Sequence, residues 1–510
     1  MSEIKIKSAL ISVFNKDGLE EITQKLIEQG ITVYSTGGTY SHLEKLGLKP
    51  EKVEDVTGYP SILDGRVKTL HPKVFGGILA RREEDHLNQL QQYDIPEIDL
   101  VVVDLYPFED TLKSTTDESK IIEKIDIGGI SLIRAAAKNY KDVLIIASQE
   151  QYGALYNILD AQNGMSTLED RRIQAAHAFD ISSHYDTAIF NYFNTSLNEG
   201  LQVFKRSERG GQTLRYGENP HQSAKFYGDL SDIMDKLAGK ELSYNNLVDI
   251  DAAVQVMSEF ENAEPSFAVL KHTNACGLAT RPTVLEAWKA ALAGDPVSAF
   301  GGILICNSSI DLATAEEINK LFYEVLIAKD FTDEAFELLS KKKKRVLIKI
   351  KTFYRHQSQY KSLLNGVIEQ DMDIKIESAE DMEPCTNIKP TDSQMQDLLF
   401  ANKLAKHLKS NTIVMAKNQQ LLGMGCGQTS RIDACHQAID KARRMGFDLE
   451  GAVMASDAFF PFPDCVEIAH KAGISAVVQP GGSINDKASI EYCNENNLAM
   501  VLSHTRHFKH

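Results

Sequence analysis

The chain has 510 residues, of which 43% are hydrophobic and 25% are charged, and its formal net charge is −16. This ordinary globular composition excludes a disordered, collagen-like or coiled-coil chain and fits two large domains or three smaller ones. The acidic balance argues against a binder of duplex nucleic acid, although local cationic pockets can still hold small anions.

The first part of the chain alternates strand and helix patterns. Two expected helices are closed by glycines, Gly30 and Gly47, which favour helix ends. The expected strands are 8–14, 31–34, 100–103 and 143–147, and the expected helices are 16–29 and 40–46. Strands that alternate with helices predict a doubly wound, mostly parallel α/β sheet with helices on both faces.

A change to polar, Gly-rich sequence near residue 200 predicts two domains, 1–197 and 198–510. Mixed α/β patterning continues in the second domain. Its expected strands are 267–270, 302–306, 345–348, 412–415, 476–478 and 499–502, and its expected helices include 250–260 and 283–293. The basic run 341–345 is interpreted as a solvated loop or helix end and not as a targeting signal.

The cysteines and apolar runs exclude further classes of protein. Seven cysteines are dispersed without a Cys-x-x-Cys pair, so we expect a reducing cytoplasm and no disulfide framework or metal site. The longest apolar runs have the length of strands, and the N-terminal apolar stretch is short for a signal peptide. We therefore expect no membrane partner.

Two polar segments of the first domain are typical of anion sites. Ser35–Thr39 places two glycines and three hydroxyls between a strand and a helix, which suits a phosphate cradle or a plain glycine turn, and Lys16 could supply charge. Segment 63–72 concentrates Arg66, Lys68 and Thr69, either as a second anion site or as a solvated loop.

Two further segments of this domain carry reactive side chains. Tyr106 follows a buried strand, where a phenol can face a ligand crevice or simply pack in the core. Beyond Asp126, a glycine pair opens an Ala-rich helix that carries Arg134 and Lys138 on one face. Lys138 is either a desolvated catalytic lysine or a member of a surface pair.

In the second domain, Lys271 and His272 directly follow an apolar strand, and a turn there could bring both to one pocket. Segment 213–222 is a loop dense in polar side chains, including Arg215 and Tyr216. The segments 298–302, 425–431 and 456–462 combine glycines or exposed aromatic residues that suit a flat heteroaromatic ligand, with ordinary turns and core packing as the alternatives.

Together these motifs resemble one family along the whole chain, the bifunctional 5-aminoimidazole-4-carboxamide ribonucleotide (AICAR) formyltransferase/IMP cyclohydrolases. The matching motifs, in order, are Ser35–Thr39, Arg66–Pro72, Leu105–Phe108, Asp126–Gly129, Arg134–Asn139, Leu214–Gly217, Asn219–Gln222, Lys271–His272, Ser298–Gly301, Ser456–Phe462 and Arg506–His510. The resemblance implies an N-terminal cyclohydrolase domain with a methylglyoxal-synthase-like fold. It also implies a larger C-terminal formyltransferase domain built from cytidine-deaminase-like halves without catalytic zinc.

By this resemblance the second domain moves a formyl group from 10-formyltetrahydrofolate to the 5-amino group of AICAR. His272 would be the base, Lys271 would stabilise charge or protonate the folate nitrogen, and Asn411 would orient the formyl oxygen. The substrate-binding residues implied here are Arg215, Tyr216, Gly301, Glu324, Arg431 and Arg506. The residues implied at the folate pocket are Phe300, Phe459, Phe462 and Asp464.

The first domain would then close formyl-AICAR to IMP with loss of water. The implied catalytic residues are Lys68, Tyr106, Asp126 and Lys138. Tyr106 and the backbone near Gly128 are assigned to the oxyanion, and which of the other three is the base stays open. The implied substrate-binding residues are Ser12, Lys16, Ser35, Thr36, Gly37, Gly38, Thr39, Arg66, Thr69 and Gly128.

The resemblance further implies a homodimer and allows a structural potassium ion. With the cysteines and the charge balance, we expect a cytoplasmic protein with no tightly bound cofactor and no nucleic-acid partner. Two alternatives stay open: only one activity is retained, or the N-terminal domain is a nucleotide-binding regulatory module. Among the departures from the family pattern, Asp104 stands where Asn is common, Ala275 replaces a usual Pro, and Pro463 replaces a usual Arg. None of them removes a proposed catalytic residue.

Overall fold

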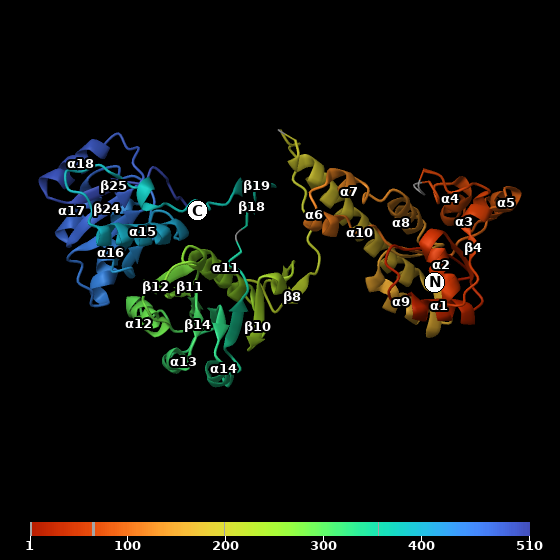
Figure 1. The fold of residues 1–510 in the computed structure, drawn as a ribbon, viewed down its shortest axis with the longest axis horizontal. Helices are drawn as coiled ribbons and strands as arrows, with labels where there is room; N and C mark the ends of the chain where they lie inside the picture. The colour runs from red at the N-terminus through yellow and green to blue at the C-terminus, as the bar shows by residue number, and fades with distance from the viewer. Residues whose placement is uncertain (1–2, 64–66, 198, 355) are drawn as a thin grey trace. The chain divides into compact units, whose positions relative to one another are not determined.

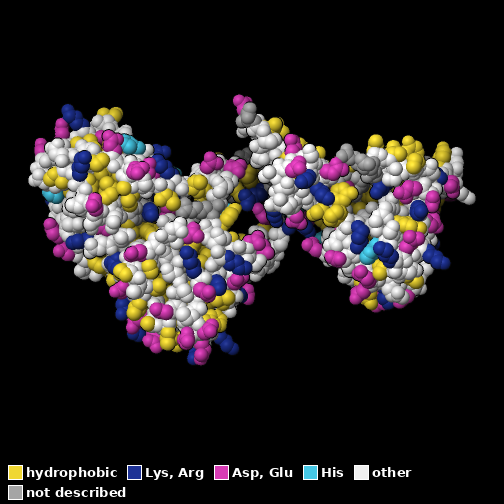
Figure 2. All heavy atoms as spheres, in the orientation of Figure 1, with side chains coloured by type: hydrophobic (Ala, Val, Ile, Leu, Met, Phe, Trp, Pro, Cys, Tyr) yellow, Lys and Arg dark blue, Asp and Glu magenta, His cyan; other side chains and the backbone are white. Residues whose placement is uncertain are grey.

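The computed structural model describes residues 3–63, 67–197, 199–354 and 356–510. Arg66, expected in the substrate site, lies outside the described residues. The chain forms two compact units, Met1–Glu208 and Arg209–His510 (Figure 1). No helix among the described residues is both long and apolar enough to cross a membrane. On the face drawn in Figure 2, acidic and basic side chains are interspersed over both units.

The first unit contains a five-stranded parallel sheet, which confirms the doubly wound α/β prediction. The strand order is β4-β3-β2-β5-β6, and every neighbouring pair is parallel. The strands are β2 (Ser8–Ser12), β3 (Thr32–Ser35), β4 (Glu51–Lys52), β5 (Leu100–Val103) and β6 (Leu144–Ile146), with a separate pair β1 (Ile4–Lys5) and β7 (Met165–Ser166). The order reverses beside β2, and a ligand crevice is expected at the carboxyl ends of the strands there.

Helices cover both faces of this sheet, and each face has its own apolar core. One core is shared with helices α1 and α9, and the other with α4, α8 and α10. The helices are α1 (Leu19–Glu28), α2 (Gly37–Lys45), α3 (Val53–Thr57), α4 (Pro72–Leu79), α5 (Glu84–Gln92), α6 (Phe108–Ser114), α7 (Glu118–Ile122), α8 (Gly128–Lys138), α9 (Tyr152–Asp160) and α10 (Leu168–Thr195).

Two helices of this unit begin at residues other than those expected. The helix expected at 16–29 begins at Leu19. The helix expected at 40–46 begins at Gly37, because Thr36 is extended and ends the strand segment. Gly37, Gly38 and Thr39 therefore form the first turn of α2 and not a loop before it. The motif presents helix-terminal backbone N–H groups at the carboxyl edge of the sheet.

The second unit is built on a twelve-stranded sheet whose two halves repeat one topology. From the centre outward, the first half is β12 (Asn274–Thr280), β11 (Ser266–Lys271), β13 (Ile303–Cys306), β15 (Val325–Ala328), β17 (Val346–Ile350) and β10 (Met234–Ala238). The second half is β22 (Gln420–Gly425), β21 (Ile413–Lys417), β23 (Ala452–Ser456), β24 (Ile474–Gln479), β25 (Ala499–Leu502) and β20 (Glu383–Pro384). Parallel and antiparallel pairs follow in the same order in both, as expected for two similar halves.

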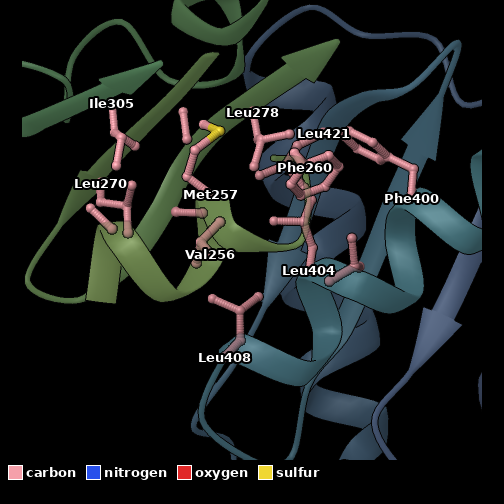
Figure 3. Close-up of a cluster of buried hydrophobic side chains, with 14 of the residues drawn as sticks. Val256, Met257, Phe260, Leu270, Leu278, Ile305, Phe400, Leu404, Leu408 and Leu421 are labelled. Atoms are coloured by element: carbon pink, nitrogen blue, oxygen red, sulfur yellow. The ribbon is translucent and has the colours of Figure 1, made fainter. Parts of the chain in front are cut away.

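Helices α11 and α15 bury one face of this sheet under a common core. Figure 3 shows Val256 and Met257 of α11 close to Leu404 of α15 and to strand residues such as Leu278. The opposite face is covered separately in each half, by α12–α14 and by α16–α18. The helices are α11 (Tyr244–Ser258), α12 (Val284–Gly294), α13 (Leu312–Ile318), α14 (Asp333–Ser340), α15 (Asp392–His407), α16 (Arg431–Arg444), α17 (Asp464–Lys471) and α18 (Asp486–Glu495).

Three short strand pairs complete this unit. They are β8 (Gln212–Leu214) with β9 (Ala224–Phe226), β14 (Ser309–Ile310) with β16 (Asp330–Phe331), and β18 (Ser358–Leu363) with β19 (Gly366–Asp371). Within the basic run 341–345, the four lysines are exposed, as expected of a loop, but Arg345 is buried. Its guanidinium donates to Asn319 and Leu321.

Candidate active sites

Two lysines flank the first turn of α2 in the first unit. The Nζ atom of Lys68 is 3.2 Å from the position that a Cβ on Gly37 would take, and Cε of Lys16 is 3.8 Å from the same position on Gly38. Gly37 has a φ of +55°, which favours glycine there. Free N–H groups, the positive end of a helix and two cations make this turn well suited to a phosphate.

The hydroxyls of this motif are not free donors, contrary to the expectation from the sequence. Ser35 Oγ donates to the carbonyl of Ile11 at 2.7 Å, and Thr36 Oγ1 donates to Glu54 at 2.8 Å. Thr39 Oγ1 donates to the carbonyl of Val13 at 2.9 Å. These contacts tie the motif to its neighbours, so the donors left for a ligand are the backbone N–H groups.

A second helix N-terminus adjoins the residue after Lys68. Thr69 Oγ1 is 3.3 Å from the position of a Cβ on Gly128, the first residue of α8. Since Lys68 adjoins α2 and Thr69 adjoins α8, the two helix starts lie near each other. Ser12 ends β2 at the same carboxyl edge of the sheet.

Asp126 and Tyr106 lie together beside the start of α8. Asp126 Oδ1 accepts the N–H of Gly129 at 2.6 Å. Burial raises the pKa of the Asp126 carboxyl, although the N–H groups of Gly129 and Tyr106 oppose the rise. Burial, and then the charge of Asp126, raises the pKa of the Tyr106 phenol. The pair can therefore exchange or hold a proton close to the helix start.

Lys124 was missed by the sequence reasoning. Its Nζ is 5.4 Å from the ring centroid of Tyr106 and 5.2 Å from that of Phe14. Its only signal in the sequence is its place two residues before Asp126. Lys138, in contrast, is exposed at the last position of α8. The eleven residues of that helix span about 16 Å, so the structure does not bring Lys138 beside Asp126.

Asp104 holds the loop that carries Lys16. Its carboxylate accepts the N–H of Phe14 and, at 2.9 Å, the N–H of Asn15. Lys16 Nζ donates to the carbonyls of Val13 and Phe14 at 2.9 and 2.7 Å. Burial raises the pKa of Asp104, against the effect of these N–H groups.

In the second unit, Lys271 and His272 lie at the tight turn between β11 and β12. His272 is exposed, and His272 and Thr273 have φ of 51° and 65°. Lys271 Nζ donates to the carbonyl of Phe300 at 2.7 Å. The N–H of Thr273 donates to Asp249 Oδ1 at 2.8 Å, a contact across 24 residues that no local pattern indicates.

A cavity of 270 Å³ begins at this turn, and Lys271, His272 and Asn274 are among the residues that line it. The loop after β22 lies next to the turn, because Cys426 Sγ donates to Asn274 Oδ1 at 3.4 Å. Asn411 Nδ2 donates to the carbonyl of Gln428 at 3.0 Å in the same loop. The structure therefore places Lys271, His272 and Asn411 around one loop.

Arg431 is engaged by the protein itself. The side chain is buried, its Nη2 donates to Asp457 Oδ1 at 2.7 Å, and its Nε donates to Ser456 at 2.9 Å. Asp457 Oδ2 is buried with no hydrogen-bond partner among the described residues. No local sequence pattern indicates this pairing, which holds the guanidinium at the end of β23.

Three phenylalanines expected at the folate pocket are exposed. Phe300 and Phe462 are 58% and 61% exposed and Phe459 is 36% exposed, whereas Phe460 is fully buried in the core. Phe300 packs on Phe322 with ring centroids 5.3 Å apart. Exposed rings of this size are available for stacking on a planar ligand.

The remaining expected residues make local contacts. The guanidinium of Arg215 is 5.5 Å from the ring centroid of Tyr216, and that of Arg506 is 4.7 Å from Phe508. Glu324 pairs with Lys240. Gly301 has a φ of +71°, and its N–H donates to the carbonyl of Phe322. Asp464 accepts the N–H of Cys465 at the start of α17. None of these contacts joins its residue to His272.

Comparison with known proteins shows two matching family models and relatives that match along the whole chain. The family model described as AICARFT/IMPCHase bienzyme matches residues 136–441, and the model of the MGS-like domain matches residues 18–131. The chain is 59% identical to the bifunctional purine biosynthesis protein PurH of Bacteroides thetaiotaomicron over the full length of both. It is 44% identical to PurH of Acetivibrio thermocellus, over 99% of this chain and 100% of that one. It is also 44% identical to PurH of Chlorobium phaeobacteroides, over the full length of both.

Proposed function

The chain belongs to the AICARFT/IMPCHase bienzyme family, and from this premise we propose how its residues divide the two reactions. It is a bifunctional enzyme of the last two steps of IMP synthesis. The first step transfers a formyl group to the 5-amino group of AICAR, and the second closes formyl-AICAR to IMP with loss of water. The formyltransferase uses a folate co-substrate, which we propose to be 10-formyltetrahydrofolate, without a tightly bound cofactor.

We assign ring closure to the first domain, 1–197. The observation that supports this assignment is the meeting of two helix starts with Lys16, Lys68 and Thr69. The phosphate of formyl-AICAR binds at the start of α2. The carboxamide nitrogen then attacks the formyl carbon, and the oxygen that becomes negative is held by Tyr106 and the N–H of Gly128.

The proton transfers of ring closure involve Lys68, Asp126 and Lys138. The nitrogen loses a proton as it attacks, and the departing hydroxyl gains one as water. Asp126 is the best placed of the three, because it is half-buried beside Tyr106 and binds a proton more readily than an exposed carboxyl. The geometry does not support the role proposed for Lys138. Lys124 is the cation that lies close to Tyr106.

We assign formyl transfer to the second domain, 198–510. The 5-amino nitrogen of AICAR attacks the formyl carbon, the bond from that carbon to folate N10 breaks, and His272 accepts the proton that the amine loses. Lys271 stabilises the charge or protonates the departing N10, and Asn411 orients the formyl oxygen.

The residues proposed to bind AICAR are Arg215, Tyr216, Gly301, Glu324 and Arg506. Phe300, Phe459, Phe462 and Asp464 are proposed to border the folate. Arg431 forms a buried pair with Asp457, so we propose that it shapes the site by holding that aspartate in place.

We propose a homodimer in the cytoplasm. The hairpin of β18 and β19 is exposed along nearly its whole length, yet it carries Tyr360, Val367 and Ile368. A two-stranded hairpin with apolar side chains is marginally stable by itself, so a second copy of the chain is a suitable cover. Free cysteines at all seven positions support a reducing compartment.

We propose Asp457 as one ligand of a structural potassium ion. Its buried Oδ2 has no hydrogen-bond partner among the described residues, and a cation is one way to satisfy such an oxygen. A melting temperature that rises with potassium but not with choline would support it.

One assay tests the division of the two activities. AICAR and 10-formyltetrahydrofolate are supplied, and tetrahydrofolate and IMP are followed separately. We expect both products, with Lys68→Met stopping IMP formation while tetrahydrofolate is still released. Lys45→Met, at the other end of α2, is the control and should leave both unchanged. Tetrahydrofolate alone from the wild type would show that one activity is lost, and neither product would favour a regulatory module.

A further inference from the structure

The two halves of the large sheet repeat one local structure, a two-residue turn between the central strands. In the first half the turn is His272–Thr273, between β11 and β12, and in the second it is Asn418–Gln419, between β21 and β22. All four residues have φ between 50° and 65°. Residues other than glycine adopt this left-handed conformation at a cost, so the surroundings must hold each turn in place.

The same kind of group holds both turns. The N–H of Thr273 donates to Asp249 Oδ1 at 2.8 Å. The N–H groups of Asn418 and Gln419 donate to the carboxylate of Asp397 at 2.9 and 2.6 Å. Asp249 and Asp397 are each the sixth residue of their helices, α11 and α15. A helix carboxylate that supports a left-handed turn is thus part of the repeated fold.

The lysine before each turn is repeated as well. Lys271 Nζ donates to the carbonyl of Phe300 at 2.7 Å, and Lys417 Nζ donates to that of Glu450 at 2.5 Å. Both carbonyls precede a glycine with positive φ. The turn, the lysine contact and the carboxylate therefore belong to the scaffold of both halves, and the first turn differs in carrying His272 where the second carries Asn418.

The imidazole of His272 has no hydrogen bond to any other described residue, and its position depends on the backbone of the turn. We propose that Asp249 is a positioning residue for formyl transfer, whose carboxylate holds the turn so that His272 lies at the cavity. This proposal rests on the assignment of formyl transfer to His272. Burial raises the pKa of the half-buried Asp249 carboxyl, and the N–H of Thr273 and then the charge of His272 oppose this rise.

The test compares Asp249→Ala and Asp249→Asn with Asp397→Ala, which removes the same support from the second turn. Formyl transfer is measured as kcat and as KM for AICAR, together with the melting temperature and the cyclisation of preformed formyl-AICAR. For Asp249→Ala we expect kcat to fall about 10- to 100-fold, because the base is displaced, with KM within about threefold. Asp249→Asn keeps an oxygen that can accept the N–H of Thr273, so it should recover most of the rate.

Asp397→Ala should lower the melting temperature while kcat per folded enzyme stays within about twofold, since no reacting group lies on its turn. Equal losses of kcat in Asp249→Ala and Asp397→Ala would overturn the proposal, as would Asp249→Asn being as slow as Asp249→Ala. If Asp249→Ala does not fold, Asp249→Glu replaces it with the same expected fall in kcat. A wild type that releases no tetrahydrofolate would instead refute the proposed function.

Discussion

His272 is a single exposed side chain on a strained turn, and it is the residue on which formyl transfer is proposed to depend. Replacing it with alanine removes the base that accepts the proton of a weakly nucleophilic amine. For His272→Ala we expect a fall of about 100-fold or more in kcat of formyl transfer. Cyclisation of preformed formyl-AICAR should be unchanged, because Lys68 and Asp126 belong to the other compact unit.

The matched control for this variant is Asn418→Ala, at the same position of the equivalent turn in the second half. It should leave both rates within about twofold. Tetrahydrofolate release and IMP formation, measured with separate substrates, check both variants. Loss of both activities in folded His272→Ala would contradict the independence of the two sites.

At the scale of the elements, glycines set how closely helices pack on the central strands. A Cβ on Gly277 of β12 would lie 1.8 Å from the carbonyl oxygen of Ala291 in α12. Because that atom belongs to the helix backbone, the helix itself would have to move. We expect Gly277→Ala to lower the free energy of unfolding of the second unit by about 3 kcal/mol.

Gly366 offers a control, since a Cβ there meets no atom within 4 Å. Gly366→Ala should change stability by less than about 0.5 kcal/mol. Thermal or denaturant unfolding followed by circular dichroism measures both variants. Equal stability of the two would show that α12 adjusts to the added methyl group without cost.

His507 connects segment 503–510 to the body of the second unit. Its imidazole is buried, 2.6 Å from Asp373 Oδ2 and 3.1 Å from Glu377 Oε1. Burial alone would lower the pKa of His507, but hydrogen bonds to Asp373 and Glu377 outweigh it and raise the pKa from 6.5 to about 9. The protonated imidazole therefore stabilises the fold.

Because the folded pKa lies above the unfolded value, this stabilisation is complete below pH 6.5 and is lost as the pH rises through about 9. We expect the melting temperature of the wild type to fall over that interval. His507→Gln should be less stable by about 3 kcal/mol at pH 6.5, since two carboxylates lose their cation, and should show less pH dependence. Melting curves at several pH values measure this, and a parallel pH dependence in both proteins would refute it.

At the scale of the whole molecule, the exposed β18–β19 hairpin is the basis for the proposed dimer. Ile368 is 54% exposed on it, and a lysine there would place a charge in an apolar contact between two copies. We expect Ile368→Lys to weaken dimerisation at least about tenfold, because a buried unpaired charge is costly. Leu312→Lys, on α13 and 41% exposed, should leave the dimer unchanged.

Sedimentation over a range of concentrations distinguishes these outcomes. A wild-type protein that is monomeric at micromolar concentration would refute the dimer. A dimer that is indifferent to Ile368→Lys would place the interface elsewhere on the surface.

The sequence by itself determined the class of the fold and many of its buried strands, but it indicated neither β15 and β23 nor the order of the strands in the sheets. Leu100–Val103 and Ala499–Val501 are buried apolar runs, and the strands β5 and β25 that contain them match the expected segments residue for residue. Strands β12 and β22 were not expected, because Gly277 and Gly423 interrupt their apolar patterns. Those glycines admit a neighbouring helix, which is a property of tertiary packing and not of local preference.

For the sites, Tyr106, Lys271 and His272 were indicated by their positions after buried strands. Lys68 was indicated by a cationic segment, and Asp126 by the family resemblance of the motif that opens α8. Only the tertiary structure decided which side chains are free. It showed that the hydroxyls of Ser35 and Thr39 donate to the carbonyls of Ile11, in β2, and of Val13, just after it. It also paired Asp249 with a turn 24 residues away. Residue spacing reports local geometry, whereas hydrogen bonds between distant segments exist only after the chain has folded.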